Sequence, residues 1–319
     1  MSALLAAGSA LYGRAWEARR AAYARGLLRP KRVPAKVVSI GNLTVGGTGK
    51  TTLTLHLARL AARRGHDVAV VCRRYRQGPG GLGDEEMLYA AALGKERVFA
   101  GTRKSELAAH AAAAGRRLLL VDDGFSHWRL ERDLDLVLLD AWDPWGGGRM
   151  LPAGRLREPR RALQRASGVV WSQVERDQDP APLIAEAKSA APAARVAVGR
   201  HAVAGVRRLD GAECEASGRA VVVTGTGNPR SVARTVAEAG FQVTDLRAYP
   251  DHHWFDPEEA RREEERARAL GAQVALTAKD AVRWPLPPGD RVVVVQVRWE
   301  WVVGGEEVER LALGGVVEA

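Results

Sequence analysis

The sequence predicts an α/β fold with a doubly wound, mainly parallel sheet, a second, smaller α/β domain and an N-terminal amphipathic helix. Three observations lead to this expectation. Short runs of leucine and β-branched residues alternate with helical stretches, which is typical of βαβ units. A glycine-rich turn stands between the first such run and the helix that follows it. A basic segment with regularly spaced aromatic residues precedes both.

The glycine-rich turn is the most informative element. It follows a β-branched run at 37–40 and precedes a leucine-rich helix that ends at Gly65. Strand, glycine-rich turn, Lys-Thr and helix together form the context of a phosphate-binding P-loop, so the fold class is P-loop NTPase-like. Lys50 would reach the β- and γ-phosphates of a nucleoside triphosphate, and the Thr51 hydroxyl would ligate Mg²⁺. A plain turn with an exposed lysine would leave the Lys-Thr pair unexplained. The residues expected to hold the phosphates are Thr44, Val45, Gly46, Gly47, Thr48, Gly49, Lys50 and Thr51.

The remaining elements follow from apolar runs and helix signals. Further strands are expected at 68–71, 118–121, 134–139, 169–171, 195–198, 220–224, 274–276 and 292–295. Residues 103–115 are an alanine-rich helix, and Asp256 with Glu259 forms a capping-box pattern at the start of another. An alanine- and proline-containing stretch at 181–199 marks a domain boundary. We therefore expect an N-terminal helix at 1–28, a P-loop domain at 29–190 and an α/β domain at 191–319 that closes an active-site cleft.

Composition restricts the environment of the protein. The 319 residues suffice for about two domains with buried cores. Only two cysteines, Cys72 and Cys214, are present, which excludes a disulfide framework and favours a reducing, cytosolic compartment. No uncharged apolar run approaches the roughly 20 residues of a spanning helix. No basic residue precedes the first apolar stretch, so a secretory signal is not expected.

Positive charge is concentrated near the N-terminus. The chain carries a net charge of +10, and residues 1–36 alone contribute +7. Such a segment favours an anionic partner, either nucleic acid or a membrane surface. A stripe about 60° wide on the helix favours the membrane over nucleic acid. The stripe consists of Leu5, Tyr12, Trp16, Tyr23 and Leu27. The alternative is that it packs on the protein's own core. In either case the P-loop begins well after the helix, so removal of the helix is expected to leave ATP affinity nearly unchanged.

Several acidic and basic clusters are candidates for chemistry. Asp122 and Asp123 end an apolar strand, which is the Walker B position that holds Mg²⁺. An acidic segment at 83–86 and a His pair at 252–253 are weaker signals, because acidic loops are usually solvated and histidine pairs are more often structural. A histidine beside an aspartate can nevertheless tune a general base. The loop 151–159 carries two arginines that could clamp a phosphate.

In this order, the motifs resemble one family, the tetraacyldisaccharide 4'-kinases, which are the lipid A kinases of Gram-negative bacteria. The similarity extends over about residues 4–285. The segments that carry it are 39–51 (SIGNLTVGGTGKT), 83–85 (GDE), 122–125 (DDGF) with His127, 132–135 (RDLD), 151–154 (LPAG), 156–159 (LREP), 250–252 (PDH), and Thr277 with 279–280 (KD). Departures are Thr52 where the family usually has proline, Arg74 in place of a glycine, and Ser126 in place of a glutamine.

The resemblance implies Mg²⁺- and ATP-dependent phosphorylation of the 4'-hydroxyl of a tetraacyl glucosamine disaccharide 1-phosphate. This lipid A biosynthesis step takes place at the cytoplasmic face of the inner membrane, to which the enzyme would bind peripherally or monotopically. The implied catalytic residues are Asp84 as the base, His252, Lys50 and Asp123. Nucleotide contacts from Arg103 and Arg157 are implied, as are the metal ligands Thr51, Asp122 and Glu85. From the residues alone, Asp123 and Asp84 rank equally as the base.

Two other functions remain open. A P-loop GTPase or ATPase switch would use the same turn, but the guanine-specific Asn-Lys-x-Asp motif is absent from the sequence. A kinase for a soluble small molecule would leave the basic N-terminal helix without a role.

Overall fold

The computed structural model describes residues 3–75, 77–78 and 80–315. The expected N-terminal helix, P-loop domain and C-terminal domain also include residues 1–2, 76, 79 and 316–319, which lie outside the described residues. The chain forms two compact units. Unit 1 comprises residues 1–73, 92–200 and 300–319, and unit 2 comprises 74–91 and 201–299. The units differ from the two contiguous domains expected from the sequence, because segment 74–91 joins the C-terminal strands and segment 300–319 returns to the first unit.

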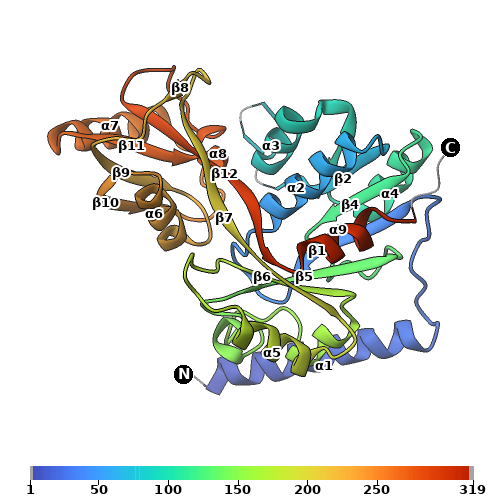
Figure 1. Cartoon of the computed structure of the whole chain (residues 1–319). Coiled ribbons are helices and arrows are strands. Elements are labelled where there is room, and N and C mark those ends of the chain that lie inside the picture. Colours follow the sequence, from blue (N-terminus) through green and yellow to red (C-terminus); the bar gives the residue numbers. More distant parts are fainter. Residues whose placement is uncertain (1–2, 76, 79, 316–319) are drawn as a thin grey trace. The chain divides into compact units, whose positions relative to one another are not determined.

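Unit 1 contains the expected parallel sheet, with strand order β7-β6-β5-β1-β4-β2-β3 (Figure 1). The strands are β1 (Lys36–Asn42), β2 (Val68–Arg73), β3 (Val98–Gly101), β4 (Leu118–Asp122), β5 (Leu134–Asp140), β6 (Gly168–Ser172) and β7 (Arg195–Arg208). Adjacent strands pair in parallel throughout this order. Strand β3 was not predicted from the sequence, because its four residues are only half-buried and its apolar pattern is weak. The central position of β1 places the P-loop at the middle of the sheet.

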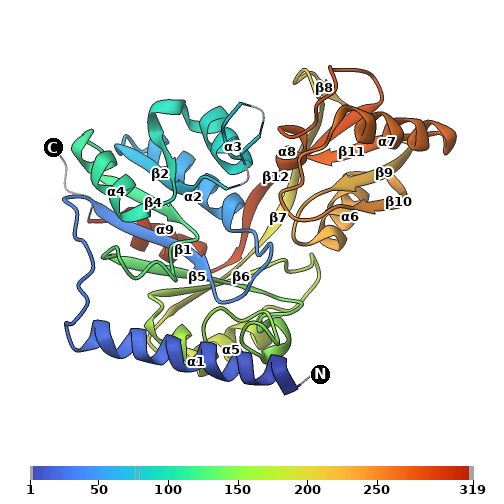
Figure 2. The ribbon, with the colours of Figure 1, turned by 180° about the vertical axis from the view of Figure 1, so that it is seen from behind.

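Helices cover both faces of this sheet (Figures 1 and 2). On one face, α2 (Lys50–Arg63) packs against β1, β2 and β4 and contacts α9 (Gly305–Leu313). On the other face, α4 (Lys104–Ala113) covers β2, β3 and β4, and the short helix η3 (Arg160–Arg165) and α5 (Ala181–Ala190) cover β5 and β6. Successive residues of β1 and β4 are buried on opposite faces, which explains their unbroken apolar runs.

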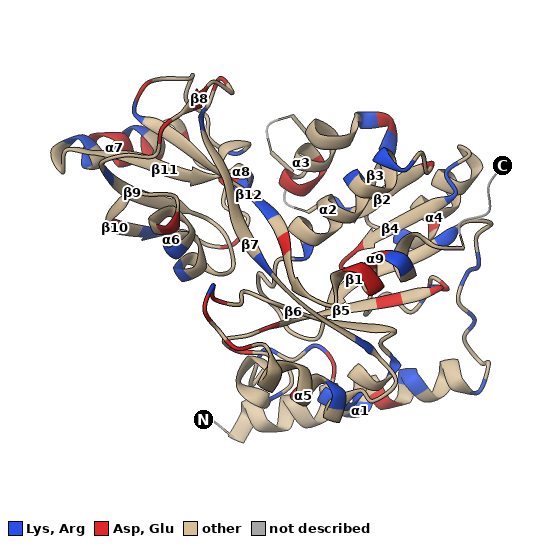
Figure 3. Ribbon diagram, in the orientation of Figure 1, with Lys and Arg blue, Asp and Glu red and all other residues tan. Residues whose placement is uncertain are grey.

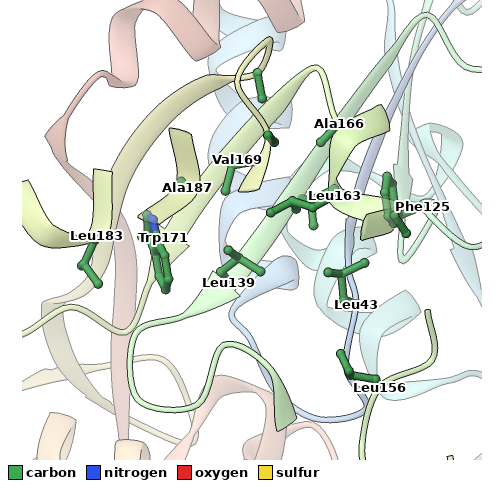
Figure 4. Packing of buried hydrophobic residues seen from close by; sticks show 14 of the residues in the cluster. Leu43, Phe125, Leu139, Leu156, Leu163, Ala166, Val169, Trp171, Leu183 and Ala187 are labelled. Atoms are coloured by element: carbon green, nitrogen blue, oxygen red, sulfur yellow. The ribbon is translucent and has the colours of Figure 1, made fainter. Parts of the chain in front are cut away.

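A hydrophobic cluster on the second face joins several of these elements (Figure 4). It includes Leu43 at the end of β1, Leu156 from the loop after β5, and Trp171 of β6. Leu163 of η3 and Ala187 of α5 complete its outer layer. The cluster therefore connects the start of the P-loop to a distant segment of the chain.

The N-terminal helix α1 (Ala3–Ala24) belongs to unit 1, and its packing corrects one expectation. Trp16 is buried at 9% exposure, and its ring meets that of Trp128 edge to face at 6.0 Å. Tyr23 contacts the same indole at 5.5 Å. The middle of the predicted membrane stripe therefore faces the protein, and Leu27 lies beyond the end of the helix. The opposite face exposes Leu4 and Leu11 at 81% and 69%.

Hydropathy along the described helices supports no membrane crossing, since none is both long and apolar enough.

Unit 2 is built on a second parallel arrangement of strands, in the order β10-β9-β11-β12. They are β9 (Arg219–Thr224), β10 (Gln242–Ala248), β11 (Ala272–Thr277) and β12 (Val292–Val303), and β8 (Glu213–Cys214) pairs antiparallel with β7. Helices α6 (Pro229–Glu238) and α7 (Pro257–Ala269) cover opposite faces, and α8 (Ala278–Ala281) follows β11. The capping box of Asp256 and Glu259 is confirmed at the start of α7.

One further helix, α3 (Asp84–Leu93), begins in the segment that joins unit 2. The short helices η1 (Lys95–Arg97) and η2 (Gly146–Gly148) complete the described elements of the chain.

Candidate functional site

The P-loop connects the central strand β1 to helix α2. Lys50 is the first residue of α2, and Gly49 before it has a left-handed conformation at φ 82°. Gly46 also has a positive φ of 127°. Glycine reaches both conformations at little cost, so the turn leaves its amide groups free to curve around an anion at the helix N-terminus. The sequence prediction of strand, turn, Lys-Thr and helix is confirmed in this part of unit 1.

The Lys50 side chain lies in a polar network at the end of the sheet. Its Nζ donates to Asn42 Oδ1 at 3.2 Å and stands 3.8 Å from Asp123 Oδ1. Arg157 contacts the same two residues: its guanidinium donates to both oxygens of Asp123, at 2.7 and 2.8 Å, and to Asn42 Oδ1. Two expected phosphate-binding cations are thereby held together by one carboxylate and one amide. Asn42 was quoted within the P-loop motif but was not assigned a role.

The environment of Asp123 determines its protonation. Burial alone would raise the pKa of this carboxyl. The positive charge of Lys50 and the hydrogen bonds from Arg157 outweigh that effect and hold its pKa far below the ordinary value. Its neighbour Asp122 is 3% exposed and ends β4, directly beside Ile40 of β1. Asp123 is therefore a stable anion between two cations.

Lys104, the residue after Arg103, has a role in this site that was not predicted from the sequence. Arg103 stands at the N-cap of α4, where it pairs with Glu106 at 2.9 Å and keeps 71% of its side chain exposed. Lys104 instead is 5% exposed, and its Nζ donates to the backbone carbonyls of Asp122 and Asp123, the latter at 2.8 Å. Asp123 has a positive φ of 50°, so this lysine supports an unusual turn. A nucleotide contact from Arg103 stays a prediction.

Ser172, at the end of β6, was also missed. Its Oγ donates to the Thr48 carbonyl at 2.8 Å, and this hydrogen bond fixes the backbone of the P-loop. A serine at a strand end carries no pattern that distinguishes this role from a solvated turn, so the sequence offered no signal for it.

A second cluster forms within unit 2 around Asp84, the first residue of α3. Asp84 is 2% exposed, and His252 Nδ1 lies 3.0 and 2.9 Å from its two carboxylate oxygens. An ionised carboxylate only accepts, so the ring N–H donates to it. The Tyr75 ring meets the imidazole edge to face at 5.1 Å, and His252 itself has a positive φ of 59°. The predicted aspartate–histidine pair is therefore formed, although the two residues are far apart in the sequence.

Two cations surround this pair, the half-buried Lys279 and the buried Arg283. Lys279 Nζ is 3.8 Å from Asp84 and 3.1 Å from Glu85, and Arg283 approaches Asp84 at 3.6 Å. Burial alone would raise the pKa of Asp84, but the His252 hydrogen bond and these cations lower it below its ordinary value. Asp280 anchors Arg283 at 2.5 Å and accepts from the Gly225 amide at 2.8 Å. Lys279 and Asp280 belong to a segment that carries the family resemblance, whereas no sequence pattern predicts a role for Arg283.

The departure at Arg74 is accommodated locally, because its guanidinium pairs with Glu86 through two hydrogen bonds of 2.8 and 2.7 Å.

The predicted metal ligands offer oxygen donors that suit Mg²⁺. Thr51 lies in the first turn of α2, and Asp122 supplies a buried carboxylate at the end of β4. Among the described residues, no group of three or more His, Cys, Asp and Glu side chains could hold a metal ion. Mg²⁺ is usually held by one or two protein oxygens together with substrate phosphates and water. Glu85, the third predicted ligand, pairs with Lys279 in unit 2.

These features define a P-loop phosphate-binding protein. The P-loop follows the central strand of a parallel sheet, an acidic pair ends the neighbouring strand, and the P-loop lysine lies where it can contact a phosphate. Sequence comparison identifies the family within this class. It matches the tetraacyldisaccharide-1-P 4'-kinase family over residues 1–313 and belongs to that family.

Individual relatives agree. The chain is 42% identical to the tetraacyldisaccharide 4'-kinase of Anaeromyxobacter dehalogenans, over 91% of this chain and 84% of that protein. It is 37% identical to the enzyme of the same name from Geobacter metallireducens, over 88% of both chains. A crystal structure of LpxK from Aquifex aeolicus in complex with ATP is similar at a TM-score of 0.71 and 25% identity, over 95% of each chain. The resemblance noted in the sequence is thereby confirmed.

Proposed function

We propose that this chain transfers the γ-phosphoryl group of ATP to the 4'-hydroxyl of a tetraacyl glucosamine disaccharide 1-phosphate. Family membership supports the substrate class. The observation that carries the proposal is the contact of His252 with the buried carboxylate of Asp84 in a chain with a P-loop. A P-loop alone serves switches and kinases equally, but transfer to an alcohol also needs a group that accepts the hydroxyl proton.

Different residues bind the phosphate and accept the proton in the proposed reaction. Lys50 and Arg157 neutralise charge on the transferred phosphate, and Asp123 holds both cations in position until the nucleotide arrives. Mg²⁺, held by Thr51 and Asp122, would add further charge neutralisation at the phosphates. The substrate hydroxyl gives its proton to the pair of Asp84 and His252, with Asp84 as the base and His252 as its partner.

The helix α1 is the proposed contact with the membrane, through a face other than the predicted stripe. Leu4 and Leu11 are strongly exposed on its outer side, and the exposed Arg14 follows Leu11 at helical spacing. Figure 3 shows that the basic residues of α1 gather in its C-terminal half. Apolar side chains beside arginines suit an anionic lipid surface, so we place the protein at the cytoplasmic face of the inner membrane as a peripheral protein.

The test is transfer of label from γ-³²P-ATP to a tetraacyl disaccharide 1-phosphate presented in mixed micelles. Lys50→Ala should lower kcat by on the order of 10² or more, because the charge-assisted contacts of the ammonium strengthen in the transition state. Lys95→Ala, a lysine in the surface helix η1, serves as the matched control and should retain activity. Release of phosphate without any labelled lipid would show a nucleotide switch instead, and near-normal transfer by Lys50→Ala would disprove the P-loop assignment.

A further inference from the structure

The inner face of α1 is hydrogen-bonded to the segment 149–157, which we call the arginine loop because it carries Arg157. Ser9 Oγ donates to the Met150 carbonyl at 2.8 Å and accepts from the Ala153 amide at 3.0 Å. Tyr12 donates its hydroxyl proton to the Arg157 carbonyl at 3.0 Å. A Cβ placed on Gly8 would stand 3.2 Å from the Pro152 ring, so α1 and the loop are in close contact there. The helix is therefore fitted to this loop by polar contacts as well as by Trp16.

The arginine loop is bound in turn to the start of the P-loop. The Val45 amide donates to the Arg155 carbonyl at 2.8 Å, and the Arg157 amide donates to the Leu43 carbonyl at 2.7 Å. Leu43 and Leu156 lie close together in the hydrophobic cluster that also contains Trp16 (Figure 4). Any displacement of the arginine loop would therefore reach the backbone that precedes the phosphate-binding turn.

The Arg157 side chain completes the connection. Its guanidinium holds Asp123 and Asn42, and these two residues orient the Lys50 ammonium. A short series of contacts therefore joins the Tyr12 hydroxyl, through the backbone and side chain of Arg157, to the lysine that would bind phosphate. Every member of this series lies in unit 1.

We propose that Ser9 and Tyr12 are positioning residues for the ATP-phosphate site, which they hold in place through the arginine loop. The inference rests on the proposed function only in that Lys50 and Arg157 bind ATP phosphate. It revises the expectation that loss of the helix leaves ATP affinity unchanged. Because the outer face of α1 is exposed, a ligand there that shifts the helix changes ATP affinity, and ATP changes the affinity of that ligand by the same factor.

The experiment measures ATP binding by the full chain, using Mg²⁺-ATP in isothermal titration without lipid. Tyr12→Phe removes one hydrogen bond and keeps the ring, so the Kd for ATP should rise about 3- to 10-fold. Ser9→Ala with Tyr12→Phe should raise it further, and Ser9→Thr, which keeps the hydroxyl, should recover part of the loss. Tyr23→Phe is the matched control, since it makes the same change on the same helix where the ring packs on Trp128.

Folding effects are separated by a second measurement, the shift in melting temperature that saturating Mg²⁺-ATP produces. This shift should be smaller in Tyr12→Phe than in the wild type even if both proteins melt at similar temperatures without nucleotide. An unchanged ATP Kd in the double variant would overturn the inference, as would an equal rise in Tyr23→Phe. A chain that binds ATP normally but labels no lipid would instead contradict the proposed function, because this experiment measures binding alone.

Discussion

Asp84 and His252 should lose activity as one unit when they are replaced. The geometry gives the reason: the imidazole Nδ1 is within 3.0 Å of both carboxylate oxygens, so replacing either residue breaks the same contact. Asp84→Asn keeps the size of the side chain and removes its charge. His252→Gln retains an N–H donor but removes a group that can take up a proton. The double variant combines both changes.

The expected magnitudes follow from general-base catalysis, which typically contributes about 10²- to 10⁴-fold to the rate. If each single variant loses about 10³-fold in kcat, independent residues would lose about 10⁶-fold together, or roughly 8 kcal/mol of barrier. Residues that act as one base should lose little more than about 10³-fold together, or roughly 4 kcal/mol. The difference, roughly 4 kcal/mol of coupling, is far larger than kinetic error.

The assay is steady-state transfer of label from γ-³²P-ATP to the lipid acceptor, with kcat and both KM values measured for all four proteins. His253→Gln is the matched control, because His253 is the adjacent histidine and contacts Glu259 at 2.9 Å in place of Asp84. It should keep near-normal kcat. Melting curves test folding, since Asp84→Asn leaves the neighbouring cations Lys279 and Arg283 less well compensated. Multiplicative losses in a folded double variant would refute a single base unit.

Three further outcomes are expected. Lys104→Met should lower the free energy of unfolding in urea by on the order of 2–4 kcal/mol, because one buried and one partly buried carbonyl lose their donor. Arg103→Ala, on the exposed side of the same helix end, should change this free energy little, and equal losses would contradict the assigned role. Burial lowers the pKa of His201 to about 4, so between about pH 6.5 and 4 the unfolded state binds more protons than the folded state. The free energy of unfolding of the wild type therefore falls as pH falls through this range, and in His201→Gln it should fall less. Leu11→Ser should reduce sedimentation with anionic vesicles at all salt concentrations and Arg14→Gln only at low salt; if neither variant binds more weakly, the outer face of α1 is not the membrane contact.

The sheet of unit 1 was largely predictable because each of its central strands is buried on both faces. Such strands are continuous apolar runs, and β1 and β4 both stand out in the sequence. The P-loop was predictable for a different reason, since phosphate binding restricts both the residue types and their order. The assignment of segments 74–91 and 300–319 to their units was not predictable, because these segments join the units through contacts between residues distant in the sequence.

The helix α1 shows the limit of periodicity as a guide to function. The spacing of Tyr12, Trp16 and Tyr23 predicted an apolar face, and Trp16 and Tyr23 on that face pack on the protein. It did not predict that Trp128, more than a hundred residues later, would cover part of that face. A hydrophobic stripe buries itself equally well in lipid or on a protein surface, so only the position of Trp128 distinguishes the two. Leu4 and Leu11 lie outside the predicted stripe, and both are exposed.

The two candidate bases, which the sequence ranked equally, differ in the groups that surround them. Both carboxylates have a lowered pKa, so acidity alone does not identify the base. Asp123 gives both oxygens to Arg157, whose guanidinium cannot release or accept a proton under physiological conditions. Both oxygens of Asp84 instead face the ring nitrogen of an imidazole, a group that can both donate and accept a proton. A proton taken from a sugar hydroxyl can therefore be shared within the Asp84 pair, whereas Asp123 would first have to lose its cation, and this favours Asp84 as the base.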